Sequence, residues 1–274
     1  MSAAITAAHA PVDAGPSRVS RTLALAGAEL RLFLRNRTAV VNSVLLPLLL
    51  VAAVPALGIG EEVGPVGPQL VVTAIGVMLV FLTYYNLLTT FVARREEQIL
   101  QRMRTGELTG LEVVLGIAAP TLLVTAGQIA VVALGVAVIG EWSAPVDVVL
   151  PVVALLCGAA LMLMLAAAST AFTRTSESAQ ITALPLLVIS SSLCGLFFPL
   201  SLMPEALATA ARYLPLTPVV ELSRLGLSGR TWDGDVVDLA GAWSAAPLPL
   251  AVLAGWLVVG AVLARRGFRW APRR

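Results

Sequence analysis

Lysine is absent from the 274 residues, so all 18 basic side chains are arginines, and His9 is the only histidine. A P-loop needs a lysine to reach the β- and γ-phosphates of a nucleotide, and a Schiff-base enzyme needs one as its nucleophile. The sequence therefore excludes both chemistries from this chain. His9 lies in a polar, Ala-rich tail, which leaves no material for a histidine-based catalytic centre or metal site.

Ionisable side chains are also missing from six long apolar runs. With 58% hydrophobic and only 12% charged residues, the composition is that of a polytopic helical membrane protein and not of a soluble domain. Each run is near the ~20 residues that a helix needs to cross ~30 Å of hydrocarbon. The runs are Ala39–Ile59, Gln69–Val92, Val113–Ile139, Val149–Phe172, Gln180–Ser201 and Pro247–Ala264. The sequence predicts an all-α integral membrane protein with six transmembrane helices.

The remaining composition narrows the class further. Cys157 and Cys194 both fall inside predicted spans, where buried packing is a better explanation than a disulfide or a ligand pair. The formal charge of +2 is too small to suggest nucleic acid as a partner. Six spans leave no room for a second folded domain, so we expect one membrane domain over residues 18–274. Residues 1–17 lack the apolar core of a signal peptide and are expected to form a disordered cytoplasmic tail.

The arginines divide the connections into two sets. Fifteen of the 18 lie before the first span, in the second and fourth connections, and after the last span. The first and third connections carry Glu61, Glu62, Glu141 and Asp147 instead, and the other three arginines share the fifth connection with several acids. Because positive charge is retained on the cytoplasmic side, both termini are expected in the cytoplasm, and the chain is expected to cross the cell membrane six times.

Residues 18–37 predict an amphipathic helix before the first span. Its apolar arc consists of Val19, Leu23, Ala26, Leu30, Phe33 and Leu34. Most of the charged residues fall on the other side, although Leu25 and Leu32 interrupt that polar arc. This pattern is typical of a helix that lies in the membrane interface with its arginines near anionic headgroups. A solvated helix with some apolar content is the alternative.

The second connection, Arg94–Glu112, predicts a short charged helix followed by a turn. Thr105-Gly106 interrupts the helix, and Thr109 with Glu112 forms a Thr-x-x-Glu capping box directly before the third span. The apolar residues Ile99, Leu100 and Met103 share one side of the first half. A docking element for a soluble partner needs such a charged loop helix, whereas a solvated hairpin is the alternative.

The segment Leu193–Gly229 is too long and too apolar for a plain outer loop. Gly195, Pro199 and Pro204 interrupt its helical pattern, which predicts a chain that dips back into the membrane where protein covers its backbone. Asp233, Asp235 and Asp238 then form an acidic patch without the ligand pattern of a calcium loop. We therefore expect a solvated acidic surface and no metal site.

These three segments, in this order around six spans, resemble the permease subunits of type-2 ATP-binding cassette (ABC) exporters from about Arg18 to the end of the chain. The pieces that carry the resemblance are ELRLFLRNR, RREEQILQRMRTGELTGLEVVLG, GLFFPLSLMP and YLPLTPVVELSR. The resemblance implies an N-terminal elbow helix, a coupling element that docks on a separate ATPase, and re-entrant outer helices after the fifth span. It also implies a second permease protomer, which would make a homodimer or a heterodimer.

The resemblance also implies roles for particular residues. The candidate contacts to the ATPase are Glu97, Ile99, Leu100, Arg102, Met103 and Arg104, and the candidate outer gate is Gly195, Phe197, Phe198, Pro199 and Pro204. The chain departs from the pattern in two places. Thr105-Gly106 stands where many relatives have Thr-Pro, and Gly116-Ile117 stands where they often have Gly-Lys.

Energetics agree with this resemblance. Proton-coupled transporters generally need an acidic residue or histidine at membrane depth, and the six predicted spans have none. The energy would therefore come from a separate ATPase that binds ATP and Mg²⁺, with no cofactor in this chain. An apolar interior suits a hydrophobic or amphipathic substrate such as a drug, a lipid or a natural product.

Two other functions remain open at this stage. The first is a membrane anchor or assembly protein that docks a cytoplasmic partner and transports nothing. The second is a membrane-embedded enzyme, for which Ser190–Ser192 is the only polar cluster in the spans. A serine run in a membrane helix is usually a helix–helix contact, and without a nearby base it holds no activated nucleophile.

Overall fold

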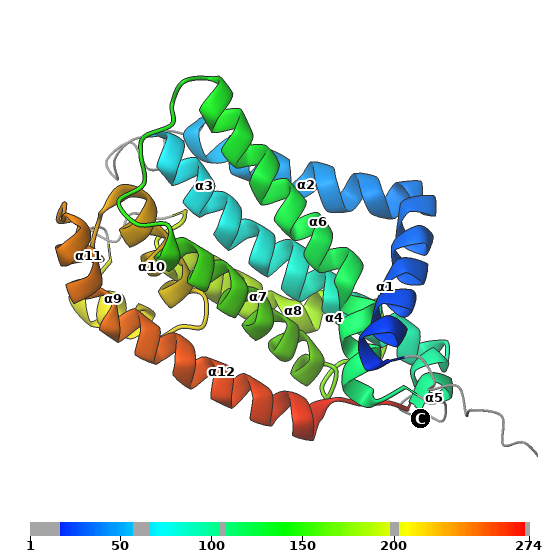
Figure 1. Ribbon diagram of the computed structural model, residues 1–274. Helices are drawn as coiled ribbons and strands as arrows, with labels where there is room; N and C mark the ends of the chain where they lie inside the picture. Colours follow the sequence, from blue (N-terminus) through cyan, green and yellow to red (C-terminus); the bar gives the residue numbers. More distant parts are fainter. Residues whose placement is uncertain (1–16, 57–65, 105–107, 198–202, 272–274) are drawn as a thin grey trace, which may run out of the picture.

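The computed structural model describes residues 17–56, 66–104, 108–197 and 203–271, and these residues form a helical bundle (Figure 1). The first half contains α1 (Arg18–Arg35), α2 (Arg37–Ala56), α3 (Val66–Val77), the π-helix η2 (Met78–Tyr85), α4 (Asn86–Glu96), α5 (Ile99–Arg104) and α6 (Gly110–Val138). The second half contains α7 (Val149–Ser169), α8 (Ser178–Leu193), α9 (Glu205–Ala211), α10 (Thr217–Ser228), α11 (Leu239–Ala245) and α12 (Pro247–Gly267).

Four helices within the described ranges are long and apolar enough to cross a membrane. They are the continuous helix Val66–Glu96, α6, α7 and α12. The other two predicted spans correspond to α2 and α8, whose apolar stretches Ser43–Ala53 and Ser178–Leu193 are shorter. The structure therefore supports a membrane protein with four candidate spans, and the count of six crossings stays a prediction.

The helix Val66–Glu96 forms the centre of the bundle. In its most apolar window 83% of the residues are buried, compared with 17% in α12, which lies at the periphery. Figure 1 shows α3 between α2, α6 and the second half of the bundle. At 31 residues the helix is about 46 Å long, which exceeds the ~30 Å of hydrocarbon. Its charged last turn therefore extends beyond the apolar part of the bundle.

Polar contacts in the membrane region join the first three predicted spans. Asn86 Nδ2 donates to Ser43 Oγ at 2.9 Å, and Gln128 Nε2 donates to the Ser43 carbonyl at 2.7 Å. The hydroxyls of Thr83 and Thr125 lie 2.9 Å apart. Because apolar burial drives little association within lipid, such hydrogen bonds and close packing supply the contact between membrane helices. They hold α2 and α6 against the π-helical part of the central helix.

The fifth predicted span is shorter in the structure than in the sequence analysis. We expected a helix over Gln180–Ser201, but α8 ends at Leu193 and Gly195 adopts φ +78°, a left-handed conformation that favours glycine. Sixteen residues give a helix of about 24 Å, which is less than the hydrocarbon thickness. Leu196 then packs where a Cβ of Gly76 would stand. The predicted interruption at Gly195 is confirmed, and the predicted end at Ser201 is wrong.

Three short helices fill the end of the bundle opposite α5 (Figure 1). Of these, α10 is almost completely buried and packs against α3, α7 and α12. Gly226 of α10 permits this packing, because a Cβ there would meet the ring of Pro151 and would lie 2.8 Å from the Asp147 carbonyl oxygen. The Gly226 carbonyl also accepts a hydrogen bond from the Asp147 amide at 2.9 Å. The buried position of α10 therefore depends on a small residue at this contact.

We predict that Gly226→Ala lowers the stability of the folded protein by about 2 kcal/mol, because neither a proline ring nor a backbone carbonyl moves aside easily. Thermal unfolding of the purified protein in a defined detergent measures the change. Gly135→Ala is the matched control, since nothing lies within 4 Å of a Cβ at that position. Equal unfolding temperatures for the two variants would contradict the contact.

Candidate functional site

The last turn of α4 and the residue after it, Arg94–Glu97, carry four consecutive charged side chains with different partners. Arg94 Nη2 donates to Glu29 Oε2 of α1 at 2.6 Å, and Arg94 Nη1 lies 3.5 Å from Glu97 Oε2. The Glu29 side chain is 9% exposed. An ion pair that is this short and this shielded fixes geometry better than an exposed surface pair. It attaches α1 to the charged end of the central helix.

Arg95 points in a different direction and is completely buried. Its guanidinium donates from Nη1 to the Thr170 carbonyl at 2.8 Å, and from Nη2 to the carbonyls of Thr173 and Arg174 at 2.7 and 3.0 Å. The last carbonyls of a helix lack intrahelical partners and carry partial negative charge, so a cation there is favourable. The planar donor fork of arginine reaches several of these oxygens at once. Arg95 thereby joins α4 to the C-terminal end of α7.

Glu96 completes the set. Its Oε2 accepts hydrogen bonds from the amide of Ser176 at 3.1 Å and from the hydroxyl of Ser176 at 2.7 Å. Ser176 belongs to the connection between α7 and α8. Three consecutive side chains of α4 therefore bind α1, α7 and the α7–α8 connection, so these elements share one structural unit at this end of the bundle.

The predicted capping box is confirmed. The Thr109 amide donates to Glu112 Oε2 at 2.6 Å, and the Glu112 amide donates to Thr109 Oγ1 at 3.4 Å. The other carboxylate oxygen of Glu112 accepts from Arg21 Nη2 of α1 at 3.3 Å. One glutamate therefore starts α6 and also holds α1, which the sequence did not reveal.

The predicted coupling helix begins later than the sequence suggested. Gln98 adopts φ +59°, which is uncommon for a residue other than glycine, and it separates α4 from the six-residue α5. The predicted break at Thr105-Gly106 lies outside the described residues. After the break at Gln98, Leu100 of α5 is completely buried and belongs to the core, so it anchors α5 and presents no surface to another protein.

The other predicted coupling residues are more accessible. The Glu97 side chain is 57% exposed, Arg102 is exposed, and Ile99 and Met103 are half-buried. Arg104 is the last residue of α5, and its side chain lies outside the described part of the chain. The surface that remains for a partner is therefore small and contains both charged and apolar side chains. It lies beside the Arg94–Glu29 pair.

Helix α1 runs across the end of the bundle (Figure 1) and packs on the protein through one side. The residues Val19, Leu23 and Leu34 of the predicted apolar arc are at least 60% exposed. Leu25, which interrupted the predicted polar arc, packs where a Cβ of Gly116 in α6 would stand. The side with Arg21, Leu25 and Glu29 therefore faces protein, while the predicted apolar arc is partly exposed, because Ala26, Leu30 and Phe33 are half-buried.

The predicted outer-gate residues lie at the opposite end. The Gly195 carbonyl accepts a hydrogen bond from Arg224 Nη2 of α10 at 3.0 Å, Phe197 is half-buried against the core, and Pro204 directly precedes α9. Phe198 and Pro199 lie outside the described residues. An ion pair between Arg212 and Glu221 at 3.3 Å stands in the same region. Within the described residues no group of three histidine, cysteine or acidic side chains could hold a metal ion.

Sequence reasoning missed Glu29, Arg95 and Arg224 as structural residues. The residue type itself indicated a structural role for each, because a charged side chain beside or within an apolar helix costs free energy unless it has a hydrogen-bond or ion-pair partner. The sequence shows the need for partners but does not identify them.

A comparison with protein families identifies the class that these features define. The chain is a helical membrane protein with four candidate spans and a charged unit at one end, and the family model described as ABC-2 family transporter protein matches residues 27–265. This match spans most of the chain, so the protein belongs to the ABC-2 transporter family, whose members are the membrane components that work with an ABC ATPase. A search of curated proteins found no match.

We predict that Arg95→Ala lowers the stability of the protein by about 3 kcal/mol, since it removes the donor from the buried hydrogen bonds to the Thr170 and Thr173 carbonyls and from a part-buried one to the Arg174 carbonyl. Arg95→Lys should recover part of this loss, because an ammonium keeps the charge but not the planar fork. Thermal unfolding in detergent measures both effects. Arg266→Ala, at an exposed position of α12, is the control, and a loss as large as that of Arg95→Ala would contradict the specific contact.

Proposed function

We propose that the chain is the permease subunit of an ABC exporter that moves a hydrophobic or amphipathic substrate out of the cell. A separate ATPase subunit hydrolyses the ATP that drives this movement. The observation that carries the proposal is the unit at the end of α4, where ion pairs and hydrogen bonds join α1, α4, α6 and α7 and the buried Leu100 anchors α5. Such a unit would transfer the motion of a docked partner to several membrane helices together.

The buried polar groups support an external source of energy. In the middle of the described spans the buried polar side chains are hydroxyls and amides, such as Thr83, Thr125 and Gln128. The buried Arg95 and Glu112 stand at helix ends, and the buried Glu221 and Arg224 lie on the short α10, outside the four candidate spans. Proton-driven transport generally uses acidic or histidine side chains at membrane depth. The arrangement therefore favours a transporter driven from the cytoplasm.

The exposed residues around α5 are the proposed docking surface. Glu97, Ile99, Arg102, Met103 and Arg104 are the candidates for contact with the ATPase. Leu100 takes a supporting role in the proposal, since its burial anchors the helix. The ion pair of Arg94 with Glu29 would pass a displacement of α5 to α1.

We expect that the purified chain alone hydrolyses no ATP and that transport-linked hydrolysis requires the separate ATPase. In reconstituted vesicles, Glu97→Arg with Arg102→Glu should reduce transport per ATP by about tenfold, because charge reversal disturbs docking while the buried anchors remain. Transport of a fluorescent hydrophobic substrate and phosphate release give the two measurements.

Glu205→Arg, a charge reversal at the far end of the molecule, is the control. Specific ATP turnover by the isolated chain would contradict the proposal. A chain that binds the ATPase firmly but moves no substrate would instead support the alternative function, a membrane anchor for a cytoplasmic partner.

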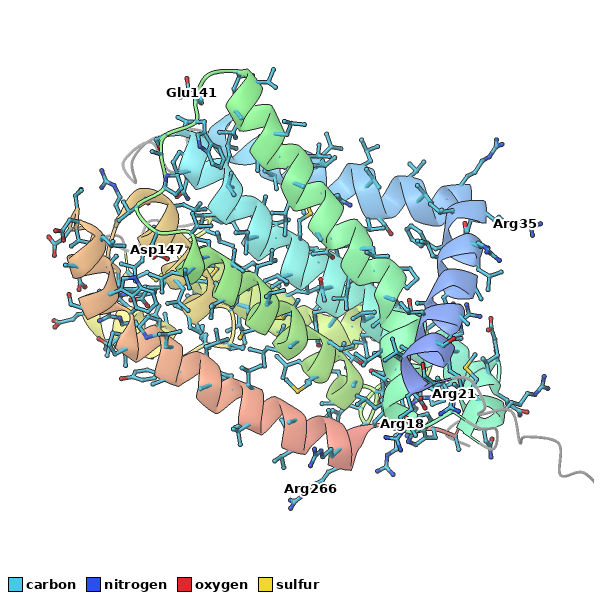
Figure 2. The ribbon with its side chains drawn as sticks, in the orientation of Figure 1. Arg18, Arg21, Arg35, Glu141, Asp147 and Arg266 are labelled. Atoms are coloured by element: carbon cyan, nitrogen blue, oxygen red, sulfur yellow. The ribbon has the colours of Figure 1, made fainter. Side chains whose placement is uncertain are left out.

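We further propose six crossings of the cell membrane with both termini inside, with α2 and α8 as the two additional spans. The distribution of charge supports this topology. Figure 2 shows Arg18, Arg21 and Arg266 at one end of the bundle and Glu141 with Asp147 at the other. The short α8 would cross with help from α9 and α10, which complete the outer part of the bundle.

Single cysteines in a background of Cys157→Ala and Cys194→Ala test this topology with a membrane-impermeant thiol reagent. Glu61, Glu141 and Glu205 should label from outside, and Arg18, Arg102 and Arg174 only after permeabilisation. The pair Arg18 and Glu61 decides whether α2 crosses, and the pair Arg174 and Glu205 decides for α8. Labelling of both members of a pair from the same side would refute that crossing.

The outer gate and the oligomer complete the proposal. Gly195, Phe197, Phe198, Pro199 and Pro204 would close the outer end of the pathway, and the support is the end of α8 within the thickness of the membrane. A second permease protomer, identical or related, would face this region. The exposed apolar residues Ile181, Leu184 and Val188 of α8 support such a contact or contact with lipid.

A further inference from the structure

The chain continues beyond α12 as a short segment, Phe268–Trp270, that crosses the cytoplasmic end of the bundle. The ring of Phe268 packs edge-to-face on Phe91 of α4, with centroids 5.5 Å apart and an interplanar angle of 90°. The ring of Trp270 packs in the same way on Phe268, at 4.7 Å and 79°. Phe91 is completely buried. The segment therefore joins the aromatic core one turn before Arg95.

The same segment touches the beginning of α6. A Cβ at Gly110, the first residue of α6, would lie 2.9 Å from Cζ2 and 3.2 Å from Cη2 of Trp270. Gly110 directly follows Thr109, the first residue of the capping box. The indole thus lies against the backbone where the connection from α5 enters the membrane helix, and only glycine leaves room for it there.

A third contact reaches α7. The amide of Arg269 donates to Thr170 Oγ1 at 3.3 Å, and the carbonyl of this same Thr170 accepts from Arg95 at 2.8 Å. Thr170 is 1% exposed. The segment after α12 is therefore attached to the ends of α4, α6 and α7, which are the helices whose ends also carry the charged contacts of the candidate coupling site.

We propose that Phe268–Trp270 is a strap that positions the start of α6 and so holds the docking segment in the orientation that couples ATP hydrolysis to transport. The inference rests on the proposed function. In it Trp270 is a positioning residue, because the indole packs against the backbone of Gly110 and would act through that contact. Loss of the strap would leave the ATPase able to bind but would loosen the connection between its motion and α6.

The glycine–tryptophan contact allows a paired test. Trp270→Ala removes the indole, and Gly110→Ala displaces it with a methyl group at the same contact. The double variant should behave like Trp270→Ala alone, since the methyl group then meets no ring. Gly127→Ala on α6 is the control, because nothing lies within 4 Å of a Cβ there. Trp270→Phe should retain most of the contact.

The first measurement is hydrogen exchange of the purified chain in lipid nanodiscs without any ATPase. The amides of Glu112 and Val113, which bond to Thr109, should exchange about fivefold faster in Trp270→Ala and Gly110→Ala than in the parent. Exchange equal to that of the Gly127→Ala control would overturn the strap. This result does not depend on a partner, so it is distinguishable from a failure of the proposed function.

The second measurement is transport per ATP in vesicles that also contain the ATPase. We expect Trp270→Ala and Gly110→Ala to lower this ratio at least about threefold while the ATPase still co-purifies with the chain. An unchanged ratio together with faster exchange would make the segment a packing element only and would overturn the proposal. Failure of the proposed function would show separately, as a parent chain without ATP-dependent transport.

Discussion

The guanidinium of Arg95 makes the contacts on which the charged end of the bundle, at α4 and α5, depends. Burying a cation costs free energy unless its donors are used, and Arg95 gives hydrogen bonds to three carbonyls at and beyond the end of α7. Those carbonyls in turn need donors, because the helix that would have supplied them has ended. Each group therefore satisfies the other, and α4 and α7 meet at a fixed distance. Neither Arg94 nor Glu96 could make its own contact if α4 ended elsewhere.

Because its last turn is held in this way, the central helix can link the two ends of the bundle as one rigid element. The helix from Val66 to Glu96 contacts Leu196 at Gly76, and its charged last turn binds α1 and α7. A continuous and mostly buried helix resists bending, although its π-helical part, η2, has a weaker hydrogen-bond pattern than an α-helix and is the natural place for a local change. A movement at the charged end would therefore reach the opposite half of the bundle through one element and not through a chain of loops.

Local patterns predicted the parts of this fold that local energetics determine. The apolar runs gave the principal membrane helices, amphipathic spacing gave α1, and Thr109 with Glu112 gave the start of α6, because each depends on residues within a few turns of one another. The pairing of Arg94 with Glu29 joins residues 65 positions apart, so no spacing rule contains it. The break at Gln98 could not be predicted from a glycine, because none is present there. The early end of α8 is accompanied by a contact between Leu196 and Gly76, which are distant in the sequence. In the candidate site, the position of the charged segment Glu97–Arg104 could be predicted, but the burial of Leu100 and the partners of the neighbouring charged residues could not.

The end of the bundle with α9, α10 and α11 also pairs a buried arginine with a backbone carbonyl, as the charged end does. Because α8 ends at Leu193, the backbone beyond it must find donors within the protein, since lipid offers none. Arg224, which is 5% exposed, donates to the Gly195 carbonyl from α10. An arginine inside an apolar bundle would be unfavourable without this carbonyl, and the carbonyl would be unfavourable without the arginine. The burial of α10 therefore follows from the break in α8, which explains why a helix with Glu221 and Arg224 lies against α3 and α7 and not in solvent.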